Sequence, residues 1–142
     1  MAKVKKLIKV LSGYDRVFIQ THNYPDHDSV SSAFALQYLL KENGVETKLI
    51  YHGEILRDSL SKMIEKLKID IKHHSCYSMD SSDAIVIIDG NKKSKNVVEL
   101  KGTVVAVIDH HQGTEFSDLE FCDIRSDFGA CATIVFSYFA EL

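Results

Sequence analysis

The sequence predicts an α/β fold, an open and mostly parallel sheet of five strands with helices on both faces. Short runs of β-branched and aromatic residues alternate along the chain with segments whose apolar residues recur at helical spacing. Two runs, 84–89 and 104–109, are almost continuously apolar until a final aspartate, which is typical of parallel strands buried on both faces. The 142 residues are 45% hydrophobic with a single proline, so the composition indicates one globular domain without flexible linkers.

The first half of the chain is expected to contain three helices and two strands. Apolar residues at helical spacing from Val4 to Leu11 predict an amphipathic opening helix. Asp28 or Ser29 is placed to cap the second helix, and Gly44 to end it. The elements predicted here are a helix over 4–11, a strand over 16–21, a helix over 29–43, a strand over 47–51 and a helix over 55–67.

The second half is expected to contain three strands and a closing helix. A turn or a short helical segment over 97–100 separates the two apolar runs. Ser126 or Asp127 is placed to cap the last helix, which begins with small residues. The elements predicted here are strands over 84–89, 104–109 and 119–122, and a helix over 129–142.

Composition and charge exclude several classes of protein. Seventeen basic and twenty acidic residues give a formal charge of −3, so no long nucleic-acid duplex is expected as a partner. No apolar run approaches the roughly 20 residues that cross a bilayer, and the N-terminus has no signal cleavage pattern. A cytoplasmic location without membrane contact is therefore expected. The three cysteines form no C-x-x-C pair and suggest neither a disulfide framework nor a zinc knuckle.

Polar residues stand at the carboxyl ends of three predicted strands. These ends meet at one edge of a parallel sheet, so we expect the side chains to lie close together. Four carboxylates there would repel each other unless cations were bound. Oxygen and imidazole donors favour Mn²⁺, Mg²⁺ or Co²⁺ over a thiolate zinc site, and two ions are usual for phosphoryl chemistry. The residues are His22, Asp26 and Asp28 after the first strand, Asp89 after the third, and Asp109, His110 and His111 after the fourth.

Each part of this pattern also has a simpler interpretation when taken alone. Asp28 could be only a helix cap, and Asp89 could only begin a turn. The pair at 110–111 could be packed or exposed without a function, which is our interpretation of the pair at 73–74 because it follows no strand-end pattern. The joint occurrence of the three motifs is what favours a site.

In this combination and order, the motifs resemble those of the DHH phosphoesterases, a resemblance that covers nearly the whole chain. Residues 22–29 are similar to the first motif, Asp89 to the second, and 109–111 to the motif that names the family. His27 stands where relatives often have glycine, alanine or proline, so it is not expected to be a ligand. The resemblance implies a Rossmann-like three-layer domain that holds two Mn²⁺ ions, with Mg²⁺ or Co²⁺ as alternatives.

The resemblance also implies a role for each matching residue. Asp89, His110, His111 and Asp109 would form the catalytic group. Asp109 would orient the two histidines and His111 would face the substrate phosphate. The implied metal ligands are His22 and Asp26 for one ion, Asp28 and His110 for the second, and Asp89 for both.

Residues 1–142 are expected to be a single DHH domain that is truncated near its C-terminal end. The aspartate of a fourth motif is missing, and so is the smaller C-terminal domain that binds substrate in relatives. Asp127 lies before the last helix and is interpreted as its cap rather than as the missing ligand. We therefore expect little turnover from this chain alone.

Three functions are compatible with these residues. The first is Mn²⁺-dependent hydrolysis of phosphoester bonds in small nucleotides or short oligonucleotides by a two-metal mechanism. The alternative is an exopolyphosphatase or inorganic pyrophosphatase, and a further alternative is a non-catalytic regulatory or interaction domain of the same fold. The expected partner is a small phosphorylated substrate, and a homodimer is also considered because family members often dimerise.

Overall fold

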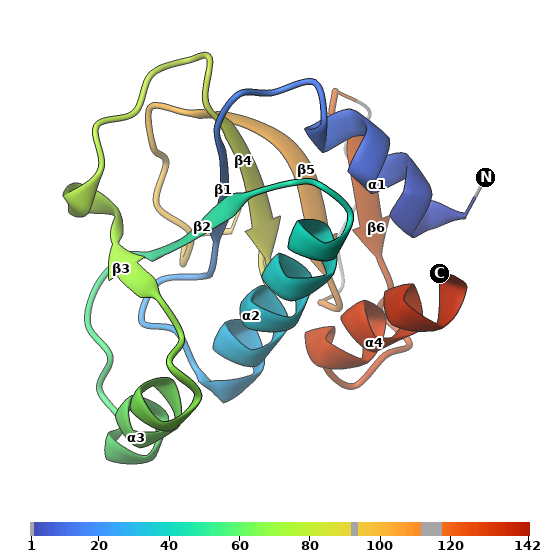
Figure 1. The fold of residues 1–142 in the computed structure, drawn as a ribbon. Coiled ribbons are helices and arrows are strands. Elements are labelled where there is room, and N and C mark those ends of the chain that lie inside the picture. The colour runs from blue at the N-terminus through green and yellow to red at the C-terminus, as the bar shows by residue number, and fades with distance from the viewer. Residues whose placement is uncertain (1, 92–93, 112–117) are drawn as a thin grey trace.

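A computed structural model describes residues 2–91, 94–111 and 118–142 and contains one six-stranded sheet with α-helices (Figure 1). The sheet has the strand order β3-β2-β1-β4-β5-β6, and every neighbouring pair is parallel. In chain order the elements are α1 (Lys3–Leu11), β1 (Val17–Gln20), α2 (His27–Glu42), β2 (Thr47–Tyr51), α3 (Asp58–Leu67), β3 (Ile71–His73), a 3₁₀ turn (His74–Cys76), β4 (Ala84–Ile88), β5 (Thr103–Asp109), β6 (Phe121–Ile124) and α4 (Cys131–Glu141).

The predicted α/β class and parallel sheet are confirmed, but the predicted number of five strands is wrong. The additional strand is β3, which pairs with β2 at the edge of the sheet through Leu49 and Ile71. It has three residues with Lys72 in the middle and none of them is fully buried. A strand of this kind has no apolar run or long alternation, so the signal that identified the other strands is absent.

The strand order changes direction between β1 and β4. From β1 the chain runs outward to β2 and β3, then returns to the other side of β1 for β4, β5 and β6. Val17 at the start of β1 pairs with Thr47 on one side and with Ala84 on the other. In open parallel sheets, ligands bind beyond the carboxyl ends of the strands at such a reversal. A ligand site is therefore expected among the residues that follow β1 and β4.

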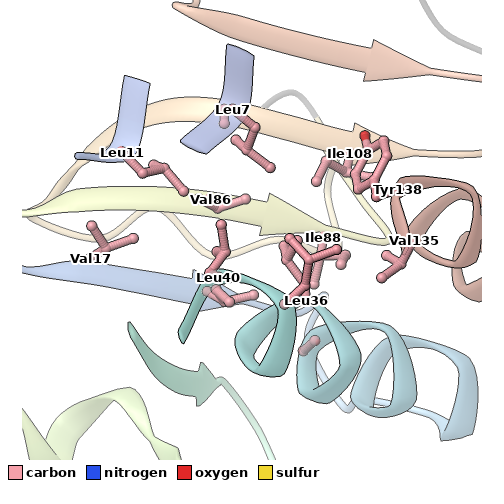
Figure 2. Packing of buried hydrophobic residues seen from close by; sticks show 14 of the residues in the cluster. Leu7, Leu11, Val17, Leu36, Leu40, Val86, Ile88, Ile108, Val135 and Tyr138 are labelled. Carbon is pink, nitrogen blue, oxygen red and sulfur yellow. The ribbon is translucent and has the colours of Figure 1, made fainter. Parts of the chain in front are cut away.

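The larger hydrophobic cluster lies between one face of the sheet and the helices. In Figure 2, Leu7 and Leu11 of α1 approach β4 and β5 beside Val86 and Ile108. Tyr138 of α4, also shown there, is fully buried in this cluster. Leu60 places α3 in the same cluster. All four α-helices thus contribute buried residues to this one face.

Helices were expected on both faces of the sheet, but connecting segments pack on the opposite face. Its cluster centres on Phe18 and Ile85, and Tyr77, Val97 and Leu100 pack onto it from connecting segments. The buried residues of this second cluster, within the ranges described above, include none from an α-helix. The apolar sequence of the strands correctly predicted that both faces of the sheet are buried. It did not predict that irregular segments bury part of this face.

The caps of two helices differ from the sequence prediction. The cap of α2 is Asp26, whose side chain accepts a hydrogen bond from the Ser29 amide, so the prediction of Asp28 or Ser29 as the cap is wrong. The last helix begins at Cys131, and Ala130 at its cap position provides no side-chain hydrogen bond. Ser126 and Asp127 therefore do not cap it as predicted. None of the helices in the described ranges is long and apolar enough to span a membrane.

Candidate metal centre

The residues after β1 form the first part of the site. Nδ1 of His22 lies 2.8 Å from the carbonyl oxygen of Asn23, and because a carbonyl only accepts, Nδ1 carries the hydrogen. In the neutral ring, Nε2 then has a free lone pair. It lies 3.6 Å from Oδ2 of Asp26 and 3.5 Å from Oδ2 of Asp89. One imidazole and two carboxylates therefore converge on a common point.

The loop that carries these residues is fixed by its own hydrogen bonds. Oδ1 of Asp26 accepts from the Ser29 amide at 2.9 Å, while the Asp26 amide donates to the Ser29 hydroxyl at 3.0 Å. This capping box occupies Oδ1 and leaves Oδ2 for the cluster. On the other side, the amide of Asn23 donates to Asn96, and its side-chain oxygen accepts from Val98 at 3.0 Å. The loop is held between α2 and the segment before β5.

Asp89, directly after β4, lies between the two halves of the site. Its Oδ2 faces His22, and its Oδ1 lies 3.1 Å from Nε2 of His110. Asp89 is buried with a φ of 62°, a left-handed conformation that costs a non-glycine residue about 1–2 kcal/mol. The next residue must be small, since a Cβ at Gly90 would lie 2.8 Å from Val97 and 3.6 Å from Cβ of His22. The backbone is strained so that one carboxylate reaches two histidines.

Asp109, at the end of β5, holds the adjacent histidine pair. This fully buried carboxylate accepts from the His110 amide at 2.8 Å, and the same oxygen lies 2.7 Å from Nδ1 of His111. A carboxylate only accepts, so Nδ1 of His111 donates and its Nε2 is left for another partner. The side chain of His111 is 57% exposed, so that partner can come from solvent.

The structure gives Asp28 a second task that the sequence did not indicate. Its carboxylate accepts from the first turn of α4, from the Cys131 amide at Oδ2 and the Ala132 amide at Oδ1, both at 3.0 Å. Asp28 thereby caps a helix that lies 103 residues further along the chain. Its Oδ2 is 3.8 Å from Nε2 of His110, farther than the 3.1 Å between Oδ1 of Asp89 and the same nitrogen.

We expect Asp28→Ala to destabilise the domain by about 1–2 kcal/mol, because two helix amides lose their acceptor. Asp28→Asn keeps one acceptor oxygen and should cost less. Urea unfolding gives the free energies, and amide hydrogen exchange at Cys131 and Ala132 shows whether the loss is local. Asp58→Ala is the matched control, since Asp58 also lies in the first turn of a helix but its carboxylate is 91% exposed. Equal effects of the two substitutions would contradict the capping role.

The carboxylates perturb the titration of the groups around them. The hydrogen bond with Asp89 is the main reason that the pKa of His22 is raised to about 9, against the opposing effect of burial. Burial and the neighbouring Asp28 and Asp26 raise the pKa of Asp89. Burial acts in the same direction on Asp26, but hydrogen bonds from Ser29 and the charge of His22 outweigh it and lower that pKa. Positive charge is favoured at the centre of the cluster.

The donor atoms fit a divalent cation that prefers oxygen and imidazole. Two buried carboxylate oxygens accept no hydrogen bond in the part of the chain that the structure describes: Oδ2 of Asp109, and Oδ1 of Asp89, which lies 3.1 Å from Nε2 of His110. Buried polar atoms of this kind normally have a partner, and an ion would provide one. Cys131 is an unsuitable ligand, since its thiol contacts the Ile108 carbonyl at 3.6 Å and burial strongly raises its pKa. This donor set matches Mn²⁺ or Mg²⁺ rather than a thiolate zinc site.

All seven residues singled out at the strand ends thus lie at one edge of the sheet. Two subsets have ligand atoms within 4.8 Å of each other, and Asp89 belongs to both. The sequence did not indicate the backbone amides of Asn23 and Cys131. The first anchors the loop after β1, and the second binds Asp28 from the first turn of α4. No residue type marks a backbone donor, so only the fold reveals them. The two subsets are His22, Asp26 and Asp89, and Asp89, Asp109, His110 and His111.

Fold and site together define an α/β domain with a candidate cation site of carboxylates and histidines at the switch point of a parallel sheet. Comparison with known proteins is consistent with this class. Residues 16–141 match the model of the DHH family, N-terminal domain. The chain therefore belongs to the DHH family, as the motif resemblance indicated.

Individual relatives extend beyond the region of similarity. An uncharacterised protein of Methanocaldococcus jannaschii is 32% identical over 126 residues, which are 89% of this chain and 26% of that protein. A probable manganese-dependent inorganic pyrophosphatase of Bacillus licheniformis is 27% identical over 128 residues, 89% of this chain and 41% of the relative. This chain thus spans about a quarter to two fifths of the length of these relatives.

A solved structure has the same fold. The crystal structure of an exopolyphosphatase-related protein from Bacteroides fragilis superimposes with a TM-score of 0.73 at 20% sequence identity. The match covers 98% of this chain and 43% of the other chain. At this level of identity the similarity concerns the fold.

Proposed function

We propose that this chain provides the metal-binding part of a hydrolase that cleaves phosphorus–oxygen bonds in a small phosphorylated substrate, with Mn²⁺ as the ion. The observation that carries the proposal is the position of Asp89, whose two carboxylate oxygens face His22 and His110 from a strained, buried backbone. A single carboxylate placed between two imidazoles is suited to bridge two cations.

The residues of the chain have distinct tasks in this proposal. His22, Asp26 and Asp89 would hold one ion, and Asp89, His110 and Asp28 the other. Bound cations would neutralise phosphate charge and activate water for in-line attack. His111 offers its exposed Nε2 to a substrate phosphate, and Asp109 fixes the ring through the 2.7 Å hydrogen bond at Nδ1. At Asp28 the same Oδ2 that accepts from the Cys131 amide would face the ion.

Two classes of substrate follow from different observations. The names of the manganese-dependent relatives favour a phosphoanhydride, inorganic pyrophosphate. The net charge of −3 is suited to a short nucleotide as well, since neither substrate needs an extended basic surface. We propose the phosphoanhydride as the first substrate to test. Because the relatives are longer, the assay should include any longer form of the protein, with dinucleotides and adenosine bisphosphate in the same panel.

Calorimetric titration with Mn²⁺ tests the metal site without requiring turnover. We expect binding to the unmodified chain and at least about tenfold weaker binding to His22→Ala, which loses an imidazole ligand. His27→Ala is the matched control, because His27 lies five residues away and its ring contacts Ser59 on α3 instead. Absence of Mn²⁺ binding to the unmodified chain, or equal affinity in both variants, would refute the site. Metal binding without hydrolysis of any substrate in the panel would favour the regulatory alternative.

A further inference from the structure

Three histidines gather outside the candidate metal centre, at the ends of β2 and β3. His52 directly follows β2, His73 ends β3, and His74 begins the 3₁₀ turn. One ring nitrogen from each lies within 4.8 Å of the others. The sequence pattern suggested no role for the pair at 73–74 because β3 was not predicted. With β3 in place, both strands end at the edge of the sheet that also carries the metal centre.

The three rings lie close together. Nδ1 of His52 lies 2.9 Å from Nε2 of His74, and these two rings stack with centroids 5.1 Å apart. The rings of His73 and His74 are closer still, with a centroid separation of 4.4 Å. All three side chains are partly exposed. Solvent ions can therefore reach the cluster.

Neighbouring residues contact the ring of His73 and fix the backbone at His52. The hydroxyl of Ser75 lies 2.8 Å from Nδ1 of His73, closer than the Ser75 amide at 3.2 Å. Because the amide can only donate, Nδ1 accepts from it in this structure. Metal binding through Nε2 needs the other tautomer, in which Nδ1 donates to the hydroxyl, the usual arrangement of a ligating histidine. The carbonyl of His52 accepts from the Tyr24 amide at 2.9 Å. Gly53 follows with a φ of 87°, and a Cβ there would lie 2.9 Å from the Tyr24 ring.

We propose that His52, His73 and His74 form a binding site for Zn²⁺ or a similar borderline transition metal ion, separate from the manganese-type centre. Three imidazoles and no carboxylate favour Zn²⁺ over Mn²⁺ or Mg²⁺. Zinc binds imidazole nitrogen at about 2.0–2.1 Å, so tetrahedral ligand atoms lie about 3.3 Å apart. The 2.9 Å contact opens slightly, and His73 turns inward, to reach this spacing. The fourth position stays open to solvent.

The alternative is a histidine pair that shares a proton and binds no metal. The two interpretations differ in what happens to the ring nitrogens when zinc is added. In the proposed site, Zn²⁺ binding at a single location changes all three rings together. In the alternative, zinc binds only at the carboxylate centre around Asp89, if at all.

Zinc binding to the full chain, measured by competition with a chromophoric chelator in excess Mg²⁺, tests the proposal. We expect a zinc site at the three histidines whose affinity falls at least about a hundredfold in His74→Ala and about tenfold in Ser75→Ala. His27→Ala should keep the parent affinity. His22→Ala should also keep it, which separates this site from the manganese-type centre. Unchanged zinc affinity in His74→Ala would overturn the proposal.

Nuclear magnetic resonance of the unmodified chain makes the test independent of whether variants fold. The imidazole ¹⁵N resonances of His52, His73 and His74 should shift together on addition of one equivalent of Zn²⁺, with Mg²⁺ in excess. Mn²⁺ should not displace the zinc, because its preference is for oxygen ligands. Zinc-induced shifts confined to His22 and His110, or no shift at all, would refute a three-histidine site.

Discussion

Asp89→Asn is expected to weaken Mn²⁺ binding at both positions of the centre by more than about a hundredfold. Loss of an outer hydrogen-bond partner alone costs a metal site about 10–100-fold in affinity, and Asp89 faces both histidines directly. The substitution preserves the shape of the side chain, and asparagine tolerates the left-handed backbone at this position. A large effect would therefore report the lost carboxylate charge and not a changed fold.

The same variant has a second readout that does not depend on added metal. The hydrogen bond with Asp89 is the largest cause of the raised pKa of His22, about 9. In Asp89→Asn the pKa of His22, followed by NMR, should fall towards its ordinary value of 6.5. Asp70→Asn is the matched control, because Asp70 is an exposed carboxylate whose nearest cation is Lys72. An unchanged His22 titration in Asp89→Asn would contradict the placement of this carboxylate.

Proton and metal compete for Nε2 of His22, so Mn²⁺ affinity should depend on pH. The pKa of about 9 means that His22 is protonated in the metal-free chain at neutral pH. Binding then releases one proton, and affinity rises with pH until His22 is neutral. This dependence should be reduced in Asp89→Asn together with the pKa.

The sequence predicted the candidate site better than it predicted the details of the fold. Strand ends in a parallel sheet must share an edge, so motifs after three apolar runs could be placed together without coordinates. The seven residues gathered as expected because each lies within two residues of a strand end or at the start of a helix. Their roles as ligands remain predictions that the titrations above address.

Features that depend on distant parts of the chain could not be predicted in this way. The cap of α4 comes from Asp28, and no local pattern connects residues 103 positions apart. The strand β3 is too short and too polar to be recognised, and the role of His73 at its end depends on that strand. Local sequence patterns show the periodicity of an element and the residues that can cap it. Side-chain contacts to the backbone of another element depend on how the elements pack, which no local pattern shows.

The side chain of Asp123 on β6 makes contacts of this kind, between elements that are distant in the sequence, and we expect them to stabilise the fold. Its fully buried carboxylate accepts from Arg125 at 2.9 and 3.0 Å, from Lys3 of α1 at 3.0 Å and from the Tyr138 hydroxyl of α4. One carboxylate thus links a strand with the first and last helices. Burial by itself would raise the pKa of Asp123, but the hydrogen bonds from Arg125, Tyr138 and Lys3 outweigh it and lower the pKa.

Asp123→Asn should reduce the free energy of unfolding by about 3 kcal/mol, because the side chain of Arg125, only 20% exposed, loses its charge partner. A pKa lowered on folding stabilises the protein above the ordinary value of 3.8, and this contribution is lost as pH falls through the folded value. The difference between parent and variant in urea unfolding should therefore be full at pH 6 and shrink below pH 3.8. Asp58→Asn, at an exposed carboxylate, should match the parent at both pH values. A difference that stayed constant down to acid pH would show that packing, and not the charge of Asp123, joins these elements.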